Sequence, residues 1–261
     1  MSLVDIAVNF SSPQLREHIP AILERASSAG LVGLVAVGTN ELASREAFLL
    51  AKQYPGKVLA TAGVHPHYAS SWNPEVAKSI EALLTAGASA VGECGLDYFR
   101  MLSPRETQLA VFRDHLALAV RHRLPLYLHC RDAFPDFFNE IDRSAARKGV
   151  VHCFTGGRAE AEAILRLGFD IGITGWLCDA RRAGALVDAV RHIPLGRLHL
   201  ETDAPYLYPA LPGEKSSRKT RNEPCYLPRV AAEVAKVKGV GVEAVAAACT
   251  ENSRRMFGIP C

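Results

Sequence analysis

The sequence predicts a (β/α)₈ barrel that forms a single domain over residues 1–261. Eight apolar segments of strand length alternate with segments of helical periodicity, which is the element count of this fold. The length of 261 residues suits a parallel barrel of about 250 residues, and 49% hydrophobic residues can fill its core. A doubly wound sheet is disfavoured because no glycine-rich phosphate loop follows the first strand.

The first half of the chain contains four of the predicted strands, at 3–10, 31–38, 57–64 and 88–91. A helix is expected over 11–29, with Ser11 or Ser12 as its cap, Pro13 in its first turn and Gly30 at its end. Asn40 is expected to cap a second helix that ends near residue 55. Helices at 74–85 and 103–122 complete this half.

The second half repeats the pattern, with strands expected at 126–129, 150–154, 169–174 and 198–203. The helices between and after them are expected at 133–147, 158–167, 179–192, 224–238 and 242–257. The segment 204–223 is the one long irregular stretch, and its length indicates a functional loop. It carries a group of cations that suits a phosphate backbone: Lys215, Arg218, Lys219 and Arg221.

Composition limits the classes of function. A formal net charge of +3 does not by itself predict binding to nucleic acid or to a membrane. We expect no membrane partner, because no apolar run approaches the roughly 18 residues of a membrane span and no secretory signal is visible. Seven scattered cysteines without a Cys-x-x-Cys pair favour reduced thiols in the cytoplasm. Nothing implies an obligate protein partner, and we expect a monomer.

Polar residues gather where the predicted strands end. In a parallel barrel these carboxyl ends share one rim, which is where active sites of this fold lie. A single histidine at a strand end is more often structural, but several imidazoles and carboxylates together suit a divalent metal such as zinc, manganese or magnesium. The residues at these ends are His65, His67, Glu93, His129, His152 and Asp203.

The stretch around Glu93 is the most informative of these strand ends. Gly92 and Gly95 flank the carboxylate, and we expect them to leave room for a metal and a phosphate. Cys94 follows Glu93 directly, as Cys130 and Cys153 follow His129 and His152, so strand alternation predicts buried, structural thiols. Two residues beyond His129, Arg131 either binds an anion or pairs with a carboxylate such as Asp97.

Seven ordered motifs resemble the TatD family of metal-dependent deoxyribonucleases, which belongs to the amidohydrolase-like barrels. They are GVHPH at 63–67, GECGLD at 92–97, HCRD at 129–132, HCFTG at 152–156, GITG at 172–175, ETDAPY at 201–206 and RNEP at 221–224. The resemblance runs nearly end to end. It implies a TIM barrel with a divalent-metal site and 3′–5′ exonuclease activity on single-stranded DNA and RNA.

The resemblance also implies roles for individual residues. The matching metal ligands are Glu93, His129, His152 and Asp203. Glu93, Asp203 and His65 are the expected catalytic residues, with Asp203 accepting the proton of the attacking water and His65 acting near the scissile phosphate. The expected phosphate contacts are His65, His67, Arg131 and Arg221. Mg²⁺ is the expected cofactor, and Mn²⁺ or Zn²⁺ are its alternatives.

Strand one departs from most of the family. Where the family has Asp-x-His-x-His, this chain reads DIAVN at 5–9, so Ala7 and Asn9 replace two imidazoles. TatD proper resembles the chain in this loss, which favours a looser or singly occupied metal site. Two alternatives stay open: hydrolysis of another bond, such as a D-aminoacyl-tRNA ester or a cyclic amide, and a degenerate barrel that binds nucleic acid without catalysis.

Overall fold

The computed structural model describes residues 1–210, 214 and 220–259. The chain forms two compact units. Unit 1 comprises Met1–Val35, Cys153–Glu162 and Ile171–Cys261, and unit 2 comprises Ala36–His152 and Ala163–Asp170. Within the described residues no helix combines the length and the apolar character that a membrane crossing requires.

The strands form one eight-stranded sheet, and their order along the sheet, β1 to β8, is their order along the chain. The pairs whose register is described are parallel: β3 with β4, β4 with β5, β5 with β6, and β7 with β8. Helices connect the consecutive strands. This is the topology of the (β/α)₈ barrel, as the sequence predicts.

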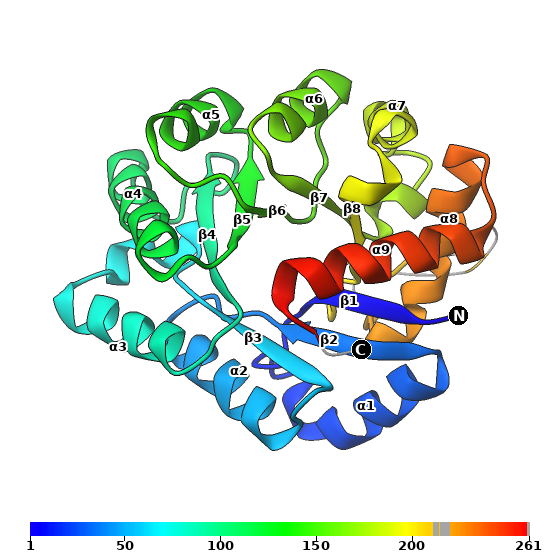
Figure 1. Cartoon of the computed structure of the whole chain (residues 1–261), viewed down its shortest axis with the longest axis horizontal. Helices are drawn as coiled ribbons and strands as arrows, with labels where there is room; N and C mark the ends of the chain where they lie inside the picture. The colour runs from blue at the N-terminus through cyan, green and yellow to red at the C-terminus, as the bar shows by residue number, and fades with distance from the viewer. Residues whose placement is uncertain (211–213, 215–219, 260–261) are drawn as a thin grey trace. The chain divides into compact units, whose positions relative to one another are not determined.

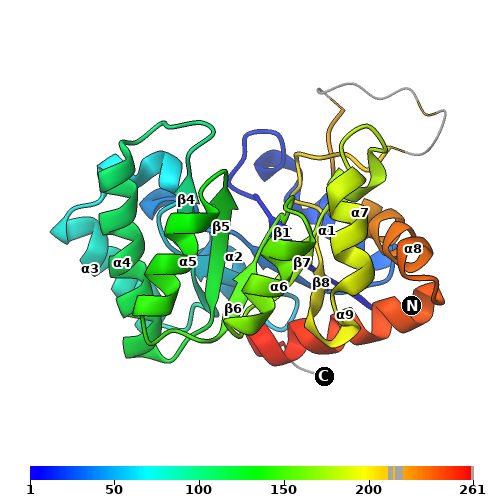
Figure 2. The ribbon, with the colours of Figure 1, turned by 90° about the horizontal axis from the view of Figure 1, so that it is seen from above.

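Unit 1 contains the beginning and the end of the chain. Its helices α7, α8 and α9 pack beside one another (Figure 2). Its elements are β1 (Leu3–Val8), α1 (Ile19–Ser28), β2 (Leu31–Ala36), α7 (Gly184–His192), β8 (Leu198–Leu200), α8 (Leu227–Lys238) and α9 (Val242–Phe257). Two further elements, α6 (Arg158–Arg166) and β7 (Asp170–Ile173), are divided between the units, and the last residue of β2, Ala36, belongs to unit 2.

Unit 2 contains the middle of the chain. Figure 1 shows α4 and α5 on the outer side of β4 and β5. The ladder between β4 and β5 is the longest described one. The elements of this unit are α2 (Glu41–Gln53), β3 (Val58–Ala62), α3 (Pro74–Thr85), β4 (Ala90–Asp97), α4 (Arg105–His122), β5 (Leu126–Arg131), α5 (Phe134–Arg143) and β6 (Gly149–Val151).

The first helix starts later than the sequence suggests. A helix capped by Ser11 or Ser12 is wrong, because α1 begins only at Ile19 and a short 3₁₀ turn, Arg16–His18, precedes it. Proline lacks the amide hydrogen that an interior helical position donates, but fits the first turn. Pro20 is the second residue of α1 and therefore lies in its first turn. In a helix that began at Ser11 or Ser12, Pro20 would occupy an interior position.

Strands β4 and β8 also differ from the prediction. Strand β4 does not stop at Val91 but runs to Asp97, so Glu93 lies inside the strand. Its pairing with β5 shifts between Val91, opposite Leu126, and Cys94, opposite Leu128, so β4 carries one extra residue. Strand β8 is shorter than predicted and ends at Leu200, three residues before Asp203.

Candidate active site

Glu93 lies at the centre of a buried cluster of imidazoles in unit 2. Its Oε1 atom is 2.7 Å from Nε2 of His152, 3.1 Å from Nδ1 of His129 and 3.3 Å from Nε2 of His65. Glu93, His65 and His152 are each at most 7% exposed. Three predicted metal ligands and the predicted catalytic histidine are therefore brought together around one carboxylate oxygen.

The bulge in β4 gives Glu93 its position. Gly92 and Gly95 have φ of +139° and +138°, a conformation that residues with a side chain rarely adopt. A Cβ at Gly92 would collide with the carbonyl oxygen of Tyr127, and one at Gly95 with that of His129. The expectation that these glycines leave room for a metal and a phosphate is therefore wrong, because the backbone of β5 occupies that space.

Asp97 is a member of the cluster that the sequence did not predict as a site residue. Its Oδ2 atom is 2.8 Å from Nε2 of His67 and 3.3 Å from Nε2 of His129. Its Oδ1 atom accepts a hydrogen bond of 2.8 Å from the amide of Arg100. His129 therefore has one ring nitrogen facing Glu93 and the other facing Asp97, which is the arrangement that orients a metal-ligating histidine.

His65 is held by His67, and the backbone of the preceding residue, Val64, is held by His115. The amide of His67 donates to Nδ1 of His65 at 3.0 Å, so a neutral His65 carries its proton on Nε2, the atom that faces Glu93. The amide of Val64 donates to Nε2 of His115, a fully buried histidine of α4, at 3.0 Å. His115 lies on the buried face of α4 next to Leu116. Its place in the apolar helical pattern could have identified it from the sequence as a buried histidine.

The pKa values of Glu93 and His65 are both lowered. Burial raises the pKa of Glu93, but the neighbouring His152 and His65 and the hydrogen bonds of His129 and His152 outweigh it and hold the pKa well below its usual range. Burial lowers the pKa of His65 to about 4 against the opposing charge of Glu93. At neutral pH the cluster thus presents an ionised carboxylate beside a neutral imidazole.

His129 and Asp97 shift in opposite directions. Burial lowers the pKa of His129, but the neighbouring carboxylates of Asp97 and Glu93 outweigh it, and the net pKa is raised. Burial likewise opposes ionisation of Asp97, but the neighbouring imidazoles of His129 and His67 hold its pKa below the usual range. A raised pKa marks His129 as the more basic imidazole, which makes it a strong electron-pair donor.

These residues fit a divalent metal ion. His65, Glu93 and His129 each offer a ligand atom, and these atoms lie within 4.8 Å of one another. Nε2 of His129 is buried and has no hydrogen-bond partner among the described residues, although Asp97 is 3.3 Å away. Metal binding requires neutral imidazoles and ionised carboxylates, and these are the states of His65 and Glu93 at neutral pH. The cluster therefore includes two of the predicted ligands, Glu93 and His129, together with His65, which the sequence predicts as a catalytic residue and phosphate contact.

Asp203 belongs to unit 1, where Asn9 contacts it. Nδ2 of Asn9 donates to Oδ1 of Asp203 at 2.9 Å and to the carbonyl oxygen of Ala204 at 3.2 Å. Asp203 has a φ of +55°, an uncommon backbone conformation for a residue other than glycine. Asn9, one of the two residues that replace strand-one imidazoles, therefore serves to orient the predicted ligand Asp203.

The predicted cationic contacts have different surroundings. Arg131 does not pair with Asp97; its guanidinium lies over the ring of Phe99, 4.0 Å from the ring centroid. Arg221, in unit 1, forms an ion pair of 2.6 Å with Glu223, which also pairs with Arg25. The other cations of the long loop, Lys215, Arg218 and Lys219, lie outside the described residues.

Of the three thiols predicted to be buried, Cys94 is buried, whereas Cys130 and Cys153 are only partly buried. All six cysteines in the described part of the chain are free thiols. Cys94 is fully buried, and burial raises its pKa well above the usual value. Burial also raises the pKa of Cys130. Neither thiol suits a nucleophile, which requires a lowered pKa.

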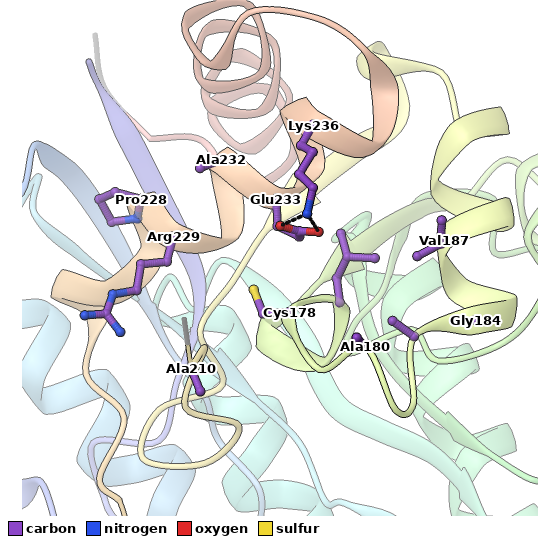
Figure 3. Close-up of a pocket in the computed structure, with 12 residues that line it drawn as sticks. Cys178, Ala180, Gly184, Val187, Ala210, Pro228, Arg229, Ala232, Glu233 and Lys236 are labelled. Carbon is purple, nitrogen blue, oxygen red and sulfur yellow. Dashed lines mark hydrogen bonds and ion pairs between the residues drawn. The ribbon is translucent and has the colours of Figure 1, made fainter. Parts of the chain in front are cut away.

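A separate pocket of about 670 Å³ lies in unit 1, against α7 and α8. Figure 3 shows Cys178 and Val187 on one side of it and Arg229 on another, with Lys236 paired to Glu233. Arg229 is also paired, with Glu214 at 2.9 Å. None of the predicted site residues is among the described residues that line it, so this pocket is distinct from the cluster around Glu93.

Comparison with known proteins identifies relatives across the chain. The family model described as TatD related DNase matches residues 4–258. A protein of Pectobacterium parmentieri named 3′–5′ ssDNA/RNA exonuclease TatD is 43% identical over 259 residues, which are 98% of this chain and 99% of that protein. A protein of Erwinia amylovora with the same name is 43% identical over 262 residues, covering 98% of this chain and 100% of that protein.

Solved structures agree with these sequence relatives. A TatD family hydrolase from Entamoeba histolytica has a TM-score of 0.89 at 27% identity, covering 99% of this chain and 98% of that chain. A TatD homologue from Escherichia coli has a TM-score of 0.89 at 28% identity with the same coverage. The likeness of fold therefore extends over nearly the entire chain.

Proposed function

Because the chain belongs to the TatD related DNase family, we propose that it is a metal-dependent exonuclease that degrades single-stranded DNA and RNA from the 3′ end. Relatives 43% identical over nearly their full length carry the name of that activity. The observation that supports it in this chain is the Glu93 carboxylate with three imidazole nitrogens within 3.3 Å of one oxygen. Such a set is typical of metal-assisted hydrolysis.

Glu93, His129 and His152 are the proposed ligands from unit 2, and Asp203 stays a ligand predicted from the sequence. A divalent cation held there would supply Lewis acidity, polarising a phosphoryl oxygen and lowering the pKa of a water molecule. Mg²⁺ is the predicted ion. Because two of the four proposed ligands, His129 and His152, offer imidazole nitrogens, we expect Mn²⁺ and Zn²⁺ to bind at least as tightly.

The chain's own residues perform the proton transfers and hold the substrate. Asp203 accepts the proton of the water that attacks phosphorus in line, while the bond from phosphorus to the leaving oxygen breaks. His65, whose neutral form carries a proton on Nε2, stabilises or protonates that oxygen. Arg131, Arg221 and His67 are the proposed contacts of the phosphate groups.

Digestion of an end-labelled single strand tests this proposal. With Mg²⁺ and a 5′ label, the products should form a ladder that shortens from the 3′ end, and a chelator should stop the reaction. Charged D-aminoacyl-tRNA and a dihydropyrimidine, tested in parallel, represent the alternative bonds. Release of amino acid or ring opening without shortening of the oligonucleotide would replace the exonuclease proposal. Binding of the strand without any cleavage would support the non-catalytic alternative.

The remaining expectations concern the protein in the cell. The free thiols of the six described cysteines are those expected of a cytoplasmic protein, and we propose that location. We also propose a monomer. Sedimentation of the purified protein over a range of concentrations checks the second expectation, because a mass above 28.2 kDa that rises with concentration would contradict it.

A further inference from the structure

Phe99 is a large apolar side chain exposed next to the cluster of unit 2. It lies two residues beyond Asp97, at the start of the segment that joins β4 to α4 (Figure 2), and is 57% exposed. The guanidinium of Arg131 lies 4.0 Å from the centroid of its ring. An exposed aromatic ring adjoining a cation is the combination with which proteins bind single-stranded nucleic acid.

Arg131 retains its hydrogen-bonding capacity in this arrangement. Within the described part of the chain its guanidinium has no hydrogen bond and no ion pair, only the contact with Phe99. Arg131 and His129 are two residues apart on β5, so their side chains leave the same face of the strand. The free N–H donors of Arg131 therefore lie on the side of the strand where His129 contacts Glu93.

The backbone that carries Phe99 is fixed by hydrogen bonds. Oδ1 of Asp97 accepts from the amide of Arg100 at 2.8 Å, and the hydroxyl of Tyr98 donates to Asp136 at 2.6 Å. At the far end of the segment, Oγ of Ser103 donates to the carbonyl oxygen of His67 at 3.2 Å. The exposed ring is thus presented by an ordered segment that is tied to residues of the cluster.

We propose that Phe99 and Arg131 form a subsite for one nucleotide of the substrate strand, which rests on the proposed exonuclease function. The base stacks on the open face of the Phe99 ring. Arg131, held in place by its own contact with the Phe99 ring, donates hydrogen bonds to the phosphate of the same nucleotide. Because every base has an aromatic face, this subsite binds the strand without selecting a sequence.

The test pairs a change in the protein with a change in the substrate. Stacking on an aromatic ring strengthens the binding of a base, so Phe99→Ala should raise KM for an oligonucleotide roughly tenfold with little change in kcat. Oligonucleotides with an abasic residue at each of the last three positions in turn then locate the contact. At one position the missing base should raise KM of the wild type roughly tenfold and leave KM of Phe99→Ala unchanged.

Two further variants complete the test. Leu49→Ala truncates a comparably exposed apolar side chain, 61% exposed on α2, and should match the wild type. Arg131→Ala should reduce the slope of log KM against log salt concentration by about 0.7, the contribution of one phosphate on a single strand. An unchanged slope would remove Arg131 from the subsite.

The results of these experiments distinguish a failure of the subsite from a failure of the proposed exonuclease function. If the wild type fails to shorten any oligonucleotide, the exonuclease proposal itself is wrong. If the wild type is active but Phe99→Ala has the wild-type KM, the subsite alone is wrong. Equal effects of each abasic position on both proteins would also overturn the subsite, because the ring would then contribute without contacting a base.

Discussion

Nε2 of His152 lies 2.7 Å from Oε1 of Glu93, the shortest of the contacts that three imidazoles make with this oxygen. A buried carboxylate with so many nitrogen neighbours is stable when a cation or a proton compensates its charge. The low pKa of Glu93, held down against burial by His152 and His65, favours the ionised form that a cation would bind.

Glu93→Gln should lower exonuclease activity at least about 100-fold, because several kcal/mol of transition-state stabilisation depend on the metal. The amide keeps the shape of the side chain but loses its charge. Release of labelled nucleotide measures the effect, and circular dichroism checks that the fold is retained. Glu81→Gln, on α3 and paired with Arg121, is the matched control and should retain full activity. Activity of Glu93→Gln within a few fold of the wild type would exclude Glu93 as a ligand.

Asp97→Asn should weaken metal binding about 10- to 100-fold without removing a proposed ligand. The carboxylate of Asp97 faces Nε2 of His129 and helps to raise the pKa of that imidazole. The neutral amide of the asparagine lacks the negative charge of Asp97, so it raises the pKa of His129 less. Calorimetric titration of the variant with Mn²⁺ gives the affinity directly. An affinity equal to that of the wild type would show that Asp97 does not support the metal site.

Asp203→Asn should abolish cleavage, since the sequence assigns Asp203 both as a ligand and as the proton acceptor. Asn9→Ala should have a smaller effect, about tenfold, because it removes only one hydrogen bond of 2.9 Å to that carboxylate. Single-turnover digestion separates these effects from product release. Equal activity of Asp203→Asn and the wild type would contradict the assignment of Asp203.

His115 predicts how stability depends on pH. Burial lowers its pKa from 6.5 to about 4, so between these values the unfolded chain binds a proton that the folded protein does not. Stability rises with pH wherever the unfolded state binds more protons, so acidification from pH 6.5 to 4 should cost roughly 3 kcal/mol through this group. Urea unfolding across this range, compared between wild type and His115→Gln, isolates the contribution. Parallel curves for the two proteins would contradict it.

The alternation of strands and helices was predictable because each apolar run is bounded by residues that end strands or cap helices. The same reasoning placed His65, His129 and His152 at strand ends, where the structure brings them to Glu93. The prediction that Glu93 is a metal ligand did not require the exact bounds of β4. It required only that Glu93 lie near the carboxyl end of that strand, where active sites of this fold are found.

The details of β4 were not predictable in this way. The extra residue between Val91 and Cys94 changes which side chains share a face, and simple alternation contains no signal for it. The sequence offers Asp97 only as a partner of Arg131, whereas its carboxylate contacts His67 and His129. Long-range contacts of this kind depend on register between strands, which a single sequence does not specify.

An anomalous difference map from crystals of the protein soaked in Mn²⁺ would locate the bound ion. We expect a strong peak bonded to the Glu93 carboxylate and to the imidazoles of His129 and His152, and its loss in crystals of Glu93→Gln. A manganese peak that touches none of these side chains, or a peak that persists at the same place in Glu93→Gln, would contradict this expectation.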